Sequence, residues 1–451
     1  MKNFTRRDFF KVGGASVAGA AAFPLLGGCG TDSNTTDSSA FTIAVIPDTQ
    51  FYTCGTVPQP TNLQIFKAQT TYLAQNQSTL GLKFVTHVGD VVEYGDGSSI
   101  NYPKNYSTTQ NIEWLNATAA LDILDAANIP FALVPGNHDY DNMYYSNSTT
   151  PGGACPPLVS TPSWWKNYFG SGSKYFKGKS WYGGASDSVG YVSTGAAGSG
   201  AGEYPAAGTL CNYGLSSYQI FSAGGKKFLH ISLEMEAGDS AIAWAQSVIT
   251  AHLNYATIVT THSYMAPPAW GDNNLPQPQY LGDPAALNAA QYLVGSPNGY
   301  NSPQNIWNKL IAPNNQIFMV LCGHSWTSIS TSTGTYVEPC GPGISKGENI
   351  RVDSNNSGNP VYQILTDYQG NIVLGSGGGD GWLRLMQFDM ANNSIHFYTL
   401  NAWSTNSSGK NVLAGQKSSV YSDGMSDFDQ PQGFSDFTLS MPAQVLTAVA
   451  S

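Results

Sequence analysis

The sequence is poor in charged side chains, above all in basic ones. Only 11% of its 451 residues are Asp, Glu, Lys or Arg, whereas about 25% is usual for a soluble domain. Nineteen residues are Lys or Arg and 29 are Asp or Glu, so the formal net charge is −10 at pH 7. This composition argues against a broad basic surface, and so against nucleic acid as a partner.

A long hydrophobic run is also missing at the N-terminus. The apolar stretch 12–26 is shorter than the ~20 residues of a membrane-spanning helix, and it follows Thr-Arg-Arg-Asp-Phe-Phe-Lys at 5–11. This twin-arginine pattern predicts an export signal over residues 1–28. The stretch ends in Leu-Gly-Gly-Cys, which resembles a bacterial lipobox, so we expect a lipid anchor at Cys29. The alternative is ordinary cleavage near the same point.

The predicted location follows from this signal. Removing residues 1–28 would take away four basic side chains and Asp8, and would change the net charge from −10 to −13. Residues 29–40 are rich in Ser, Thr, Asp and Asn and predict a flexible spacer. We expect a periplasmic or cell-surface protein that is anchored to the membrane as a lipoprotein.

Cysteines are few. Besides Cys29, the chain contains Cys54, Cys155, Cys211, Cys322 and Cys340. No spacing among these five fits a cysteine-based zinc site. In an exported protein some of them are expected to pair, Cys155 with Cys211 first, which leaves one thiol over.

Apolar runs alternate with helical patterns in the first third of the chain. Strands are predicted at 41–47, 82–88 and 130–134, and helices at 62–75 and 112–127. A β-α-β-α-β order predicts an α/β fold with a mainly parallel, buried sheet.

The rest of the chain is less regular. Residues from 141 to about 225 are rich in Gly, Ser, Pro and aromatics without periodicity, which indicates a loop-rich insertion. Helices and strands return from 227, with strands predicted at 227–233, 256–260, 316–321, 361–365, 382–389 and 394–400. The last two runs predict a hairpin, and we expect the later half to be an antiparallel sheet. Because no linker follows residue 40, we expect 41–451 to form one domain, with an extension after about 400.

Five polar clusters lie just beyond the carboxyl ends of predicted strands. They are Asp48 with Gln50, Gly89-Asp90, Gly136-Asn137-His138-Asp139, His262 and Gly323-His324. Open α/β sheets gather ligand-binding residues at this edge. A lone Asp or His at a strand end is more often a cap or a core residue. Together, however, the oxygen and imidazole donors predict a shared site for Zn, Mn or Fe.

In this order the clusters resemble the motifs of the calcineurin-like metallophosphoesterases. The family pattern is Asp-x-His, Gly-Asp, Gly-Asn-His-Asp/Glu, a later His and Gly-His-x-His, and the resemblance covers residues from about 41 to 330. It implies a four-layer α/β/β/α sandwich. It also implies a site for two divalent or trivalent ions, Mn, Fe or Zn, that hydrolyses phosphate mono- or diesters.

The resemblance implies a ligand role for five residues. Asp90 would bridge the two ions, and Asp48 would bind the first. Asn137, His262 and His324 would bind the second ion. A bridging hydroxide, formed from water between the ions, would attack phosphorus in line.

The same resemblance implies a catalytic pair. His138 would protonate the leaving oxygen or stabilise the phosphate charge, and Glu93, three residues after Asp90, would orient His138.

Two residues depart from the family pattern, and both affect the first ion. Gln50 stands where the family has a histidine ligand, and Trp326 stands where the last motif has its second histidine. Glutamine offers a carbonyl oxygen, whereas tryptophan offers no useful donor. We therefore expect Gln50 to be a weak ligand or a hydrogen-bonding neighbour, and the first ion to bind loosely.

Two functions remain open. The first is an exported, metal-dependent phosphoesterase with a phosphoester substrate. The second is a surface binding protein on the same scaffold with an impaired first metal site, which Gln50 and Trp326 favour. The retained pair of His138 and Glu93 favours the enzyme, because a protein that only binds needs no acid.

Overall fold

Two mixed β-sheets form the centre of the protein. The computed structural model describes residues 40–53, 60–93, 95, 112–140, 164–187, 191–192, 210–211, 214–266, 287–288, 301–325, 347–369, 379, 381–403, 416–417 and 436–451.

The first sheet combines the predicted N-terminal strands with the C-terminal hairpin. Its order is β15-β14-β13-β1-β2-β3, and β16 also pairs with β14. The strands are β1 Ala40–Ile46, β2 Leu82–His87, β3 Phe131–Leu133, β13 Trp382–Asp389, β14 Ser394–Asn401, β15 Gln416–Lys417 and β16 Asp436–Ser440. Because β1, β2 and β3 are parallel, their carboxyl ends lie at one edge of the sheet. The predicted hairpin of β13 and β14 is confirmed.

The second sheet has the order β11-β12-β10-β9-β8-β7-β4. Its strands are β4 Tyr182–Ala185, β7 Ser217–Ala223, β8 Lys226–Ser232, β9 Ala256–Ser263, β10 Ile317–Gly323, β11 Gly347–Ser354 and β12 Pro360–Asp367. The central strands β8, β9, β10 and β12 are parallel, so their carboxyl ends also meet at one edge. The expectation that the later half of the chain forms an antiparallel sheet is therefore wrong for β8, β9, β10 and β12, which run parallel to one another.

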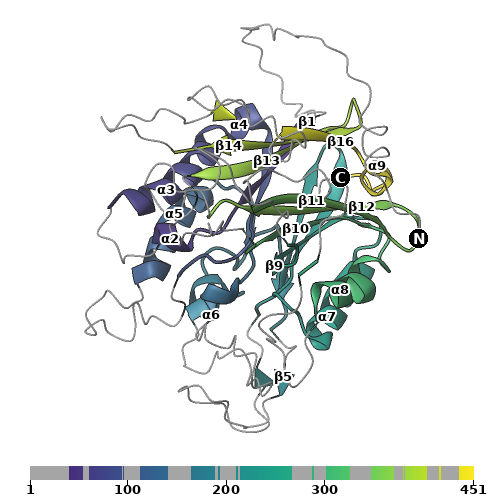
Figure 1. Cartoon of the computed structure of the whole chain (residues 1–451), viewed down its shortest axis with the longest axis horizontal. Coiled ribbons are helices and arrows are strands. Elements are labelled where there is room, and N and C mark those ends of the chain that lie inside the picture. Colours follow the sequence, from purple (N-terminus) through teal and green to yellow (C-terminus); the bar gives the residue numbers. More distant parts are fainter. Residues whose placement is uncertain are drawn as a thin grey trace, which may run out of the picture.

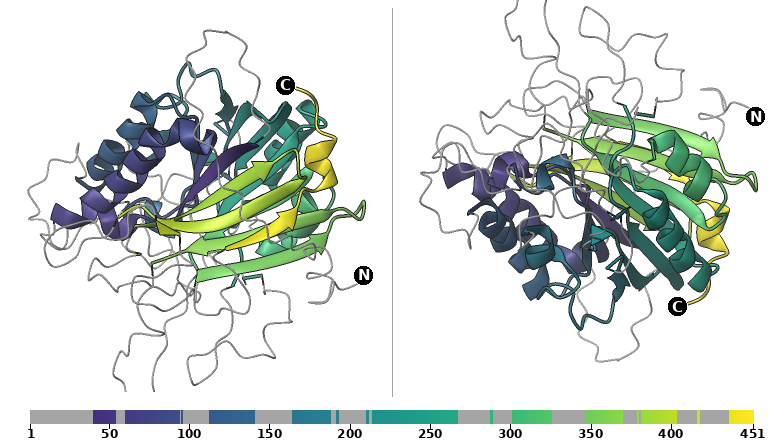
Figure 2. Two further views of the ribbon diagram at one scale, coloured as in Figure 1. Left: turned by 90° about the horizontal axis from the view of Figure 1, so that it is seen from above. Right: turned by 90° about the horizontal axis from the view of Figure 1, so that it is seen from below.

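Helices cover the outer face of each sheet (Figures 1 and 2). The first sheet carries α2 Gln50–Thr53, α3 Pro60–Gln75, α4 Gln77–Leu80, α5 Ile112–Ala126 and α6 Trp164–Phe169. The second carries α7 Asp239–Ala251, α8 Pro303–Ile306 and the π-helical turn η3 Trp307–Ile311. The buried residues of α7 show how such a helix packs. Ala241, Ala245, Val248 and Ile249 recur at helical spacing on one face.

The inner faces of the two sheets pack on each other. Phe41 of the first sheet stacks on Phe388, with ring centroids 4.6 Å apart, and meets the edge of Phe228 from the second sheet at 5.5 Å. With helices on both outer faces, this core completes the predicted four-layer α/β/β/α sandwich.

One polar group also joins the sheets. His230 Nε2 lies 3.1 Å from Thr86 Oγ1 of the first sheet and 2.8 Å from Thr260 Oγ1 of its own sheet. Its Nδ1 lies 2.9 Å from Gln219 Oε1.

The remaining elements lie at the margins. The ladder of β5 Tyr191–Val192 and β6 Leu210–Cys211 stands apart from both sheets, and α9 Ala443–Leu446 is near the C-terminus. From the range expected to be an insertion, α6, β4 and β7 join the main layers. Among the described helices, none combines the length and apolarity needed to cross a bilayer.

Several predictions concern residues outside this description. The export signal, the spacer and Cys29 lie there, as do Cys155, which was expected to pair with Cys211, and Trp326. Among the described cysteine side chains, Cys322 is buried and free.

Candidate metal centre

Asp90 occupies a tight turn after β2. Gly89 and Asp90 both have positive φ, 107° and 50°. This backbone conformation turns the Asp90 side chain away from the direction of the strand. Asp90 Oδ1 accepts a hydrogen bond of 3.0 Å from the backbone N–H of His138. A Cβ at Gly136 would lie 2.1 Å from this oxygen, so only glycine fits there. The Asp90 carboxylate therefore contacts both Gly136 and His138 of the third motif.

His262, the second-to-last residue of β9, faces Asp90. Its Nδ1 donates to the carbonyl of Val88 at 2.8 Å, because a carbonyl can only accept. Its Nε2 then points at two oxygens, 3.2 Å from Asp90 Oδ1 and 3.1 Å from Asn137 Oδ1. Burial disfavours the charged ring, but the Asp90 carboxylate outweighs it and raises the pKa of His262. A second proton or a metal ion must lie between these atoms.

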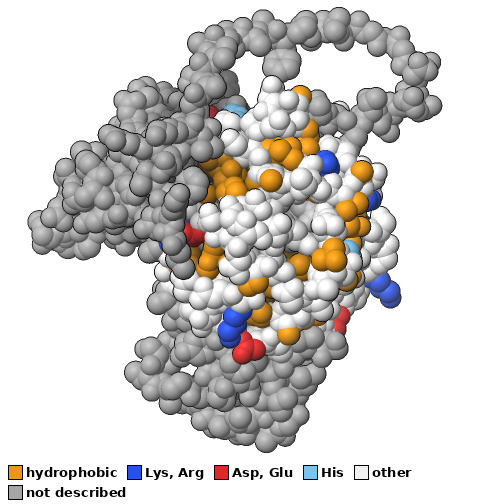
Figure 3. Space-filling view, turned by 90° about the vertical axis from the view of Figure 1, so that its right-hand side faces the viewer, with side chains coloured by type: hydrophobic (Ala, Val, Ile, Leu, Met, Phe, Trp, Pro, Cys, Tyr) orange, Lys and Arg blue, Asp and Glu red, His pale blue; other side chains and the backbone are white. Residues whose placement is uncertain are grey.

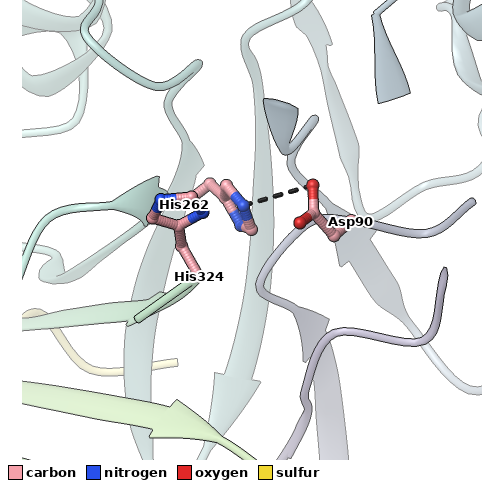
Figure 4. Close-up of side chains that lie close together, drawn as sticks. All are labelled: Asp90, His262 and His324. Carbon is pink, nitrogen blue, oxygen red and sulfur yellow. Dashed lines mark ion pairs between the residues drawn. The ribbon is translucent and has the colours of Figure 1, made fainter. Parts of the chain in front are cut away.

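His324 completes a three-residue cluster (Figure 4). It follows β10 with φ of 71°, and its ring centroid is 4.9 Å from that of His262. Asp90, His262 and His324 each offer one ligand atom, and these atoms all lie within 4.8 Å of one another. Burial, with the charge of His262, lowers the pKa of His324 to about 3, so its ring is neutral and keeps a lone pair for a cation.

Asp48 approaches the cluster from β1. Its Oδ1 accepts a hydrogen bond of 3.0 Å from the backbone N–H of His324. Its Oδ2 is buried, and within the described part of the chain it has no hydrogen-bond partner. Burial, then the charges of Asp367 and Asp90, raise the pKa of Asp48. A buried carboxylate oxygen without a donor is costly, and a bound cation would compensate for it. These residues therefore fit a metal site.

His138 and Glu93 lie beside this cluster as a pair. His138 Nδ1 is 3.0 Å from the Glu93 carbonyl and 3.3 Å from Glu93 Oε2. Because Nδ1 is engaged by Glu93, Nε2 remains for a substrate. Burial opposes a charge on His138, but the carboxylates of Asp90 and Glu93 raise its pKa above the ordinary value. The arrangement favours a protonated imidazole next to the candidate metal ligands.

Residues 41–327 match the family model of the calcineurin-like phosphoesterases. The chain belongs to this family. The positions of Asp48, Asp90, Asn137, His262 and His324 at neighbouring strand ends agree with the order of the family motifs.

Similar proteins give little further detail. The uncharacterized protein YvnB of Bacillus subtilis (strain 168) is 25% identical over 366 residues, which are 80% of this chain but 20% of YvnB. The chain thus spans about a fifth of the length of this relative.

Two solved structures are similar at low scores. Purple acid phosphatase PPD1 from yellow lupin (Lupinus luteus) seeds has a TM-score of 0.32 and 14% identity, over 83% of this chain and 53% of that one. GAP50 of Plasmodium, the anchor in the inner membrane complex, has a TM-score of 0.29 and 11% identity, over 90% and 95%. The order of the strands in the two sheets and the family match define the fold of this chain.

Gln50 departs from the family histidine and makes two amide contacts. Its Oε1 accepts a hydrogen bond from Gln369 Nε2, and its side chain also hydrogen-bonds to Glu93. Gln50 is 3% exposed, so both contacts are shielded from water. Of the two roles expected for Gln50, the structure supplies direct contacts for the hydrogen-bonding one.

Asp139 has a role that the sequence did not reveal. Its carboxylate accepts from three backbone N–H groups: Val91 at 3.1 Å, Val92 at 2.9 Å and Gly136 at 2.8 Å. Burial and the charge of Asp90 raise the pKa of Asp139 to about 7, although these hydrogen bonds oppose the shift. The fourth residue of the Gly-Asn-His-Asp motif thus ties two loops together.

Asp367 is a second acidic residue that the sequence analysis missed. It ends β12 and is fully buried near the site, and its Oδ1 accepts a hydrogen bond of 2.9 Å from the backbone N–H of Gln369. The available signal was its position two residues after the predicted strand 361–365, at the same sheet edge as the five clusters.

Proposed function

We propose that this protein is a metal-dependent phosphoesterase that binds two ions at the meeting edges of its sheets. The convergence of Asp90, His262 and His324 on one point, with a buried, unpartnered oxygen of Asp48 nearby, carries this proposal. Membership of the calcineurin-like phosphoesterase family supports the reaction class.

The ligands divide into two groups by position. His262 and His324 cluster with Asp90, and His262 also contacts Asn137, so that these side chains would hold one ion. Asp48 would hold the other, with Asp90 shared between them. When bound, the two ions would polarise the phosphate oxygens and lower the pKa of a water molecule. Oxygen and imidazole ligands of this kind suit Mn, Fe or Zn.

The chain's own residues supply the proton. His138 is positioned by its backbone N–H on Asp90 and by its Nδ1 on Glu93. With its pKa raised, it carries the proton that Nε2 would transfer to the leaving oxygen. Burial raises the pKa of Glu93, whereas the side-chain hydrogen bond of Gln50 lowers it, so Gln50 would help to hold this carboxylate beside His138.

A binding protein without catalysis is the second candidate. It is favoured by Gln50, whose oxygen already accepts from Gln369 and which offers no imidazole to the first ion.

Metal analysis combined with hydrolysis assays separates the two candidates. Purified protein should contain metal and should hydrolyse p-nitrophenyl phosphate or bis-p-nitrophenyl phosphate, with loss of activity on chelation. Asp90→Asn should remove metal and activity, whereas Asp187→Asn, the same change at an exposed residue outside the site, should change neither. A metal-free wild type that is inactive after incubation with Mn, Fe and Zn would support the binding protein.

A further inference from the structure

Asp367 and His324 lie at the carboxyl ends of two neighbouring parallel strands. In the pair of β10 and β12, the last partners are Cys322 and Leu365. Asp367 is the last residue of β12, and His324 directly follows the last residue of β10. His324 in turn donates its backbone N–H to Asp48 Oδ1. The carboxyl end of β12 is therefore next to the strand end that contacts Asp48.

Three aspartates are buried at this edge of the two sheets. Asp48, Asp90 and Asp367 are all buried, at 2%, 2% and 0% exposure. Like charges that converge away from water repel each other strongly. A divalent cation among them would turn this repulsion into attraction.

Hydrogen bonds tie the end of β12 to Gln50. Gln369 donates its backbone N–H to Asp367 and its side-chain amide to Gln50 Oε1. Gln50 stands where the family has a histidine ligand for the first ion. The segment 367–369 is thus fixed against the side of the site that lacks its usual imidazole.

We propose that Asp367 is a ligand of the first ion and supplies there a charged oxygen in place of the missing imidazole. This inference rests on the proposed function, because it needs the two-ion site. The first ion would then be held by Asp48, Asp90 and Asp367, a carboxylate set that suits Mn²⁺ better than soft, nitrogen-preferring ions.

Titration of metal-free protein with MnCl2 tests the inference, with free Mn²⁺ followed by its EPR signal. Wild type should bind two ions. Asp367→Asn should keep one ion at wild-type affinity and bind the other at least 10-fold more weakly, since perturbing ligation costs about 10–100-fold. Asp353→Asn is the matched control, because it makes the same change at the opposite end of the β11–β12 pair, opposite Val361.

Thermal unfolding separates a metal ligand from a structural residue. If Asp367 is a ligand, metal-free Asp367→Asn should be at least as stable as the metal-free wild type, since one buried like charge is gone. Its Tm should then rise less than that of wild type when Mn²⁺ is added. A structural carboxylate would instead lower the stability of the metal-free variant.

The outcomes distinguish this inference from the proposed function. Unchanged Mn²⁺ binding by Asp367→Asn would overturn the inference alone. Equal weakening of both ions in a destabilised metal-free variant would also overturn it, because Asp367 would then serve the fold. A wild type that binds no Mn²⁺, Zn²⁺ or Fe would instead contradict the proposed function itself.

Discussion

At the scale of single residues, the site is built from close contacts between glycine and carboxylate. Gly136 approaches Asp90, and Gly323 approaches Asp48, whose Oδ2 would lie 2.4 Å from an added Cβ. Two acidic side chains can be buried side by side with histidines because the neighbouring backbone carries no side chain there. The polar atoms left facing one another are stabilised by a shared proton or by the proposed metal ions.

The first prediction concerns Gly136. In Gly136→Ala the new methyl group would overlap Asp90 Oδ1 and its backbone N, which lies 2.3 Å away. We expect the shift of Asp90 to weaken metal binding at least 10-fold and to cost about 1–3 kcal/mol of unfolding free energy. Gly172→Ala is the control, because nothing lies within 4 Å of its Cβ. Metal titration measures the affinity, and denaturant unfolding measures the free energy of unfolding. A Gly136→Ala protein with wild-type values of both would contradict the packing argument.

The second prediction concerns His138 as the general acid. His138→Ala should lose about 10²–10⁴-fold in kcat with alkyl phosphate esters. It should lose less with p-nitrophenyl esters, because p-nitrophenolate departs without a proton. Metal content should stay at the wild-type level. His252→Ala, at the end of α7, controls for loss of an imidazole elsewhere. Equal losses on both kinds of ester would refute the acid role.

At the scale of elements, the ends of parallel strands decide which residues meet. The strands 41–47, 82–88 and 130–134 were predictable because buried parallel strands are continuous apolar runs. The edge strand β11 was not, since residues such as Glu348, Asn349, Arg351 and Asp353 give it no apolar run and its pairing with β12 defines it. Asp367 was missed for a related reason. A single Asp after an apolar run has no local pattern, and only the parallel pairing of β12 with β10 places it at the sheet edge that His324 also occupies.

The third prediction concerns the histidine between the two sheets. Burial lowers the pKa of His230 to about 3, below the ~6.5 of an unfolded chain. Between these values the unfolded state binds a proton that the folded state does not, so the free energy of unfolding falls as pH falls. The contribution is about 1.4 kcal/mol per pH unit below 6.5.

Denaturant unfolding at several pH values between 6 and 4.5 tests this prediction. In His230→Gln, the free energy of unfolding should fall less steeply as the pH falls, by about 1.4 kcal/mol per pH unit. The decline should not vanish, because His87 is also buried with its pKa lowered to about 3. Identical slopes for variant and wild type would show that His230 is not held neutral by the fold.

At the scale of the whole molecule, sparse charge and a buried site go together. Figure 3 shows a face on which the described charged side chains are few and scattered, with hydrophobic side chains between many of them. A formal net charge of −10 at pH 7 does not attract phosphates to the molecule as a whole, so the proposed phosphoesterase would bind its substrate through the site itself. The four-layer arrangement was predictable from the family motifs, whereas the contacts of Gln50 with Glu93 and Gln369 depend on the folded chain.

The fourth prediction concerns location. Replacing Arg6 and Arg7 with Lys should leave precursor in the cytoplasm, and Cys29→Ala should release the protein from membranes. Cell fractionation and immunoblotting measure both, with Cys54→Ala as the control for loss of a thiol. Unchanged membrane association in Cys29→Ala would rule out the lipid anchor.

Anomalous X-ray diffraction from crystals grown with MnCl2 tests the two-ion site most directly. Two manganese peaks are expected at the strand ends, both within ligand distance of Asp90. One should contact Asn137, His262 and His324, and the other should contact Asp48. No anomalous peak within ligand distance of Asp90, at a manganese concentration that supports hydrolysis, would contradict the account.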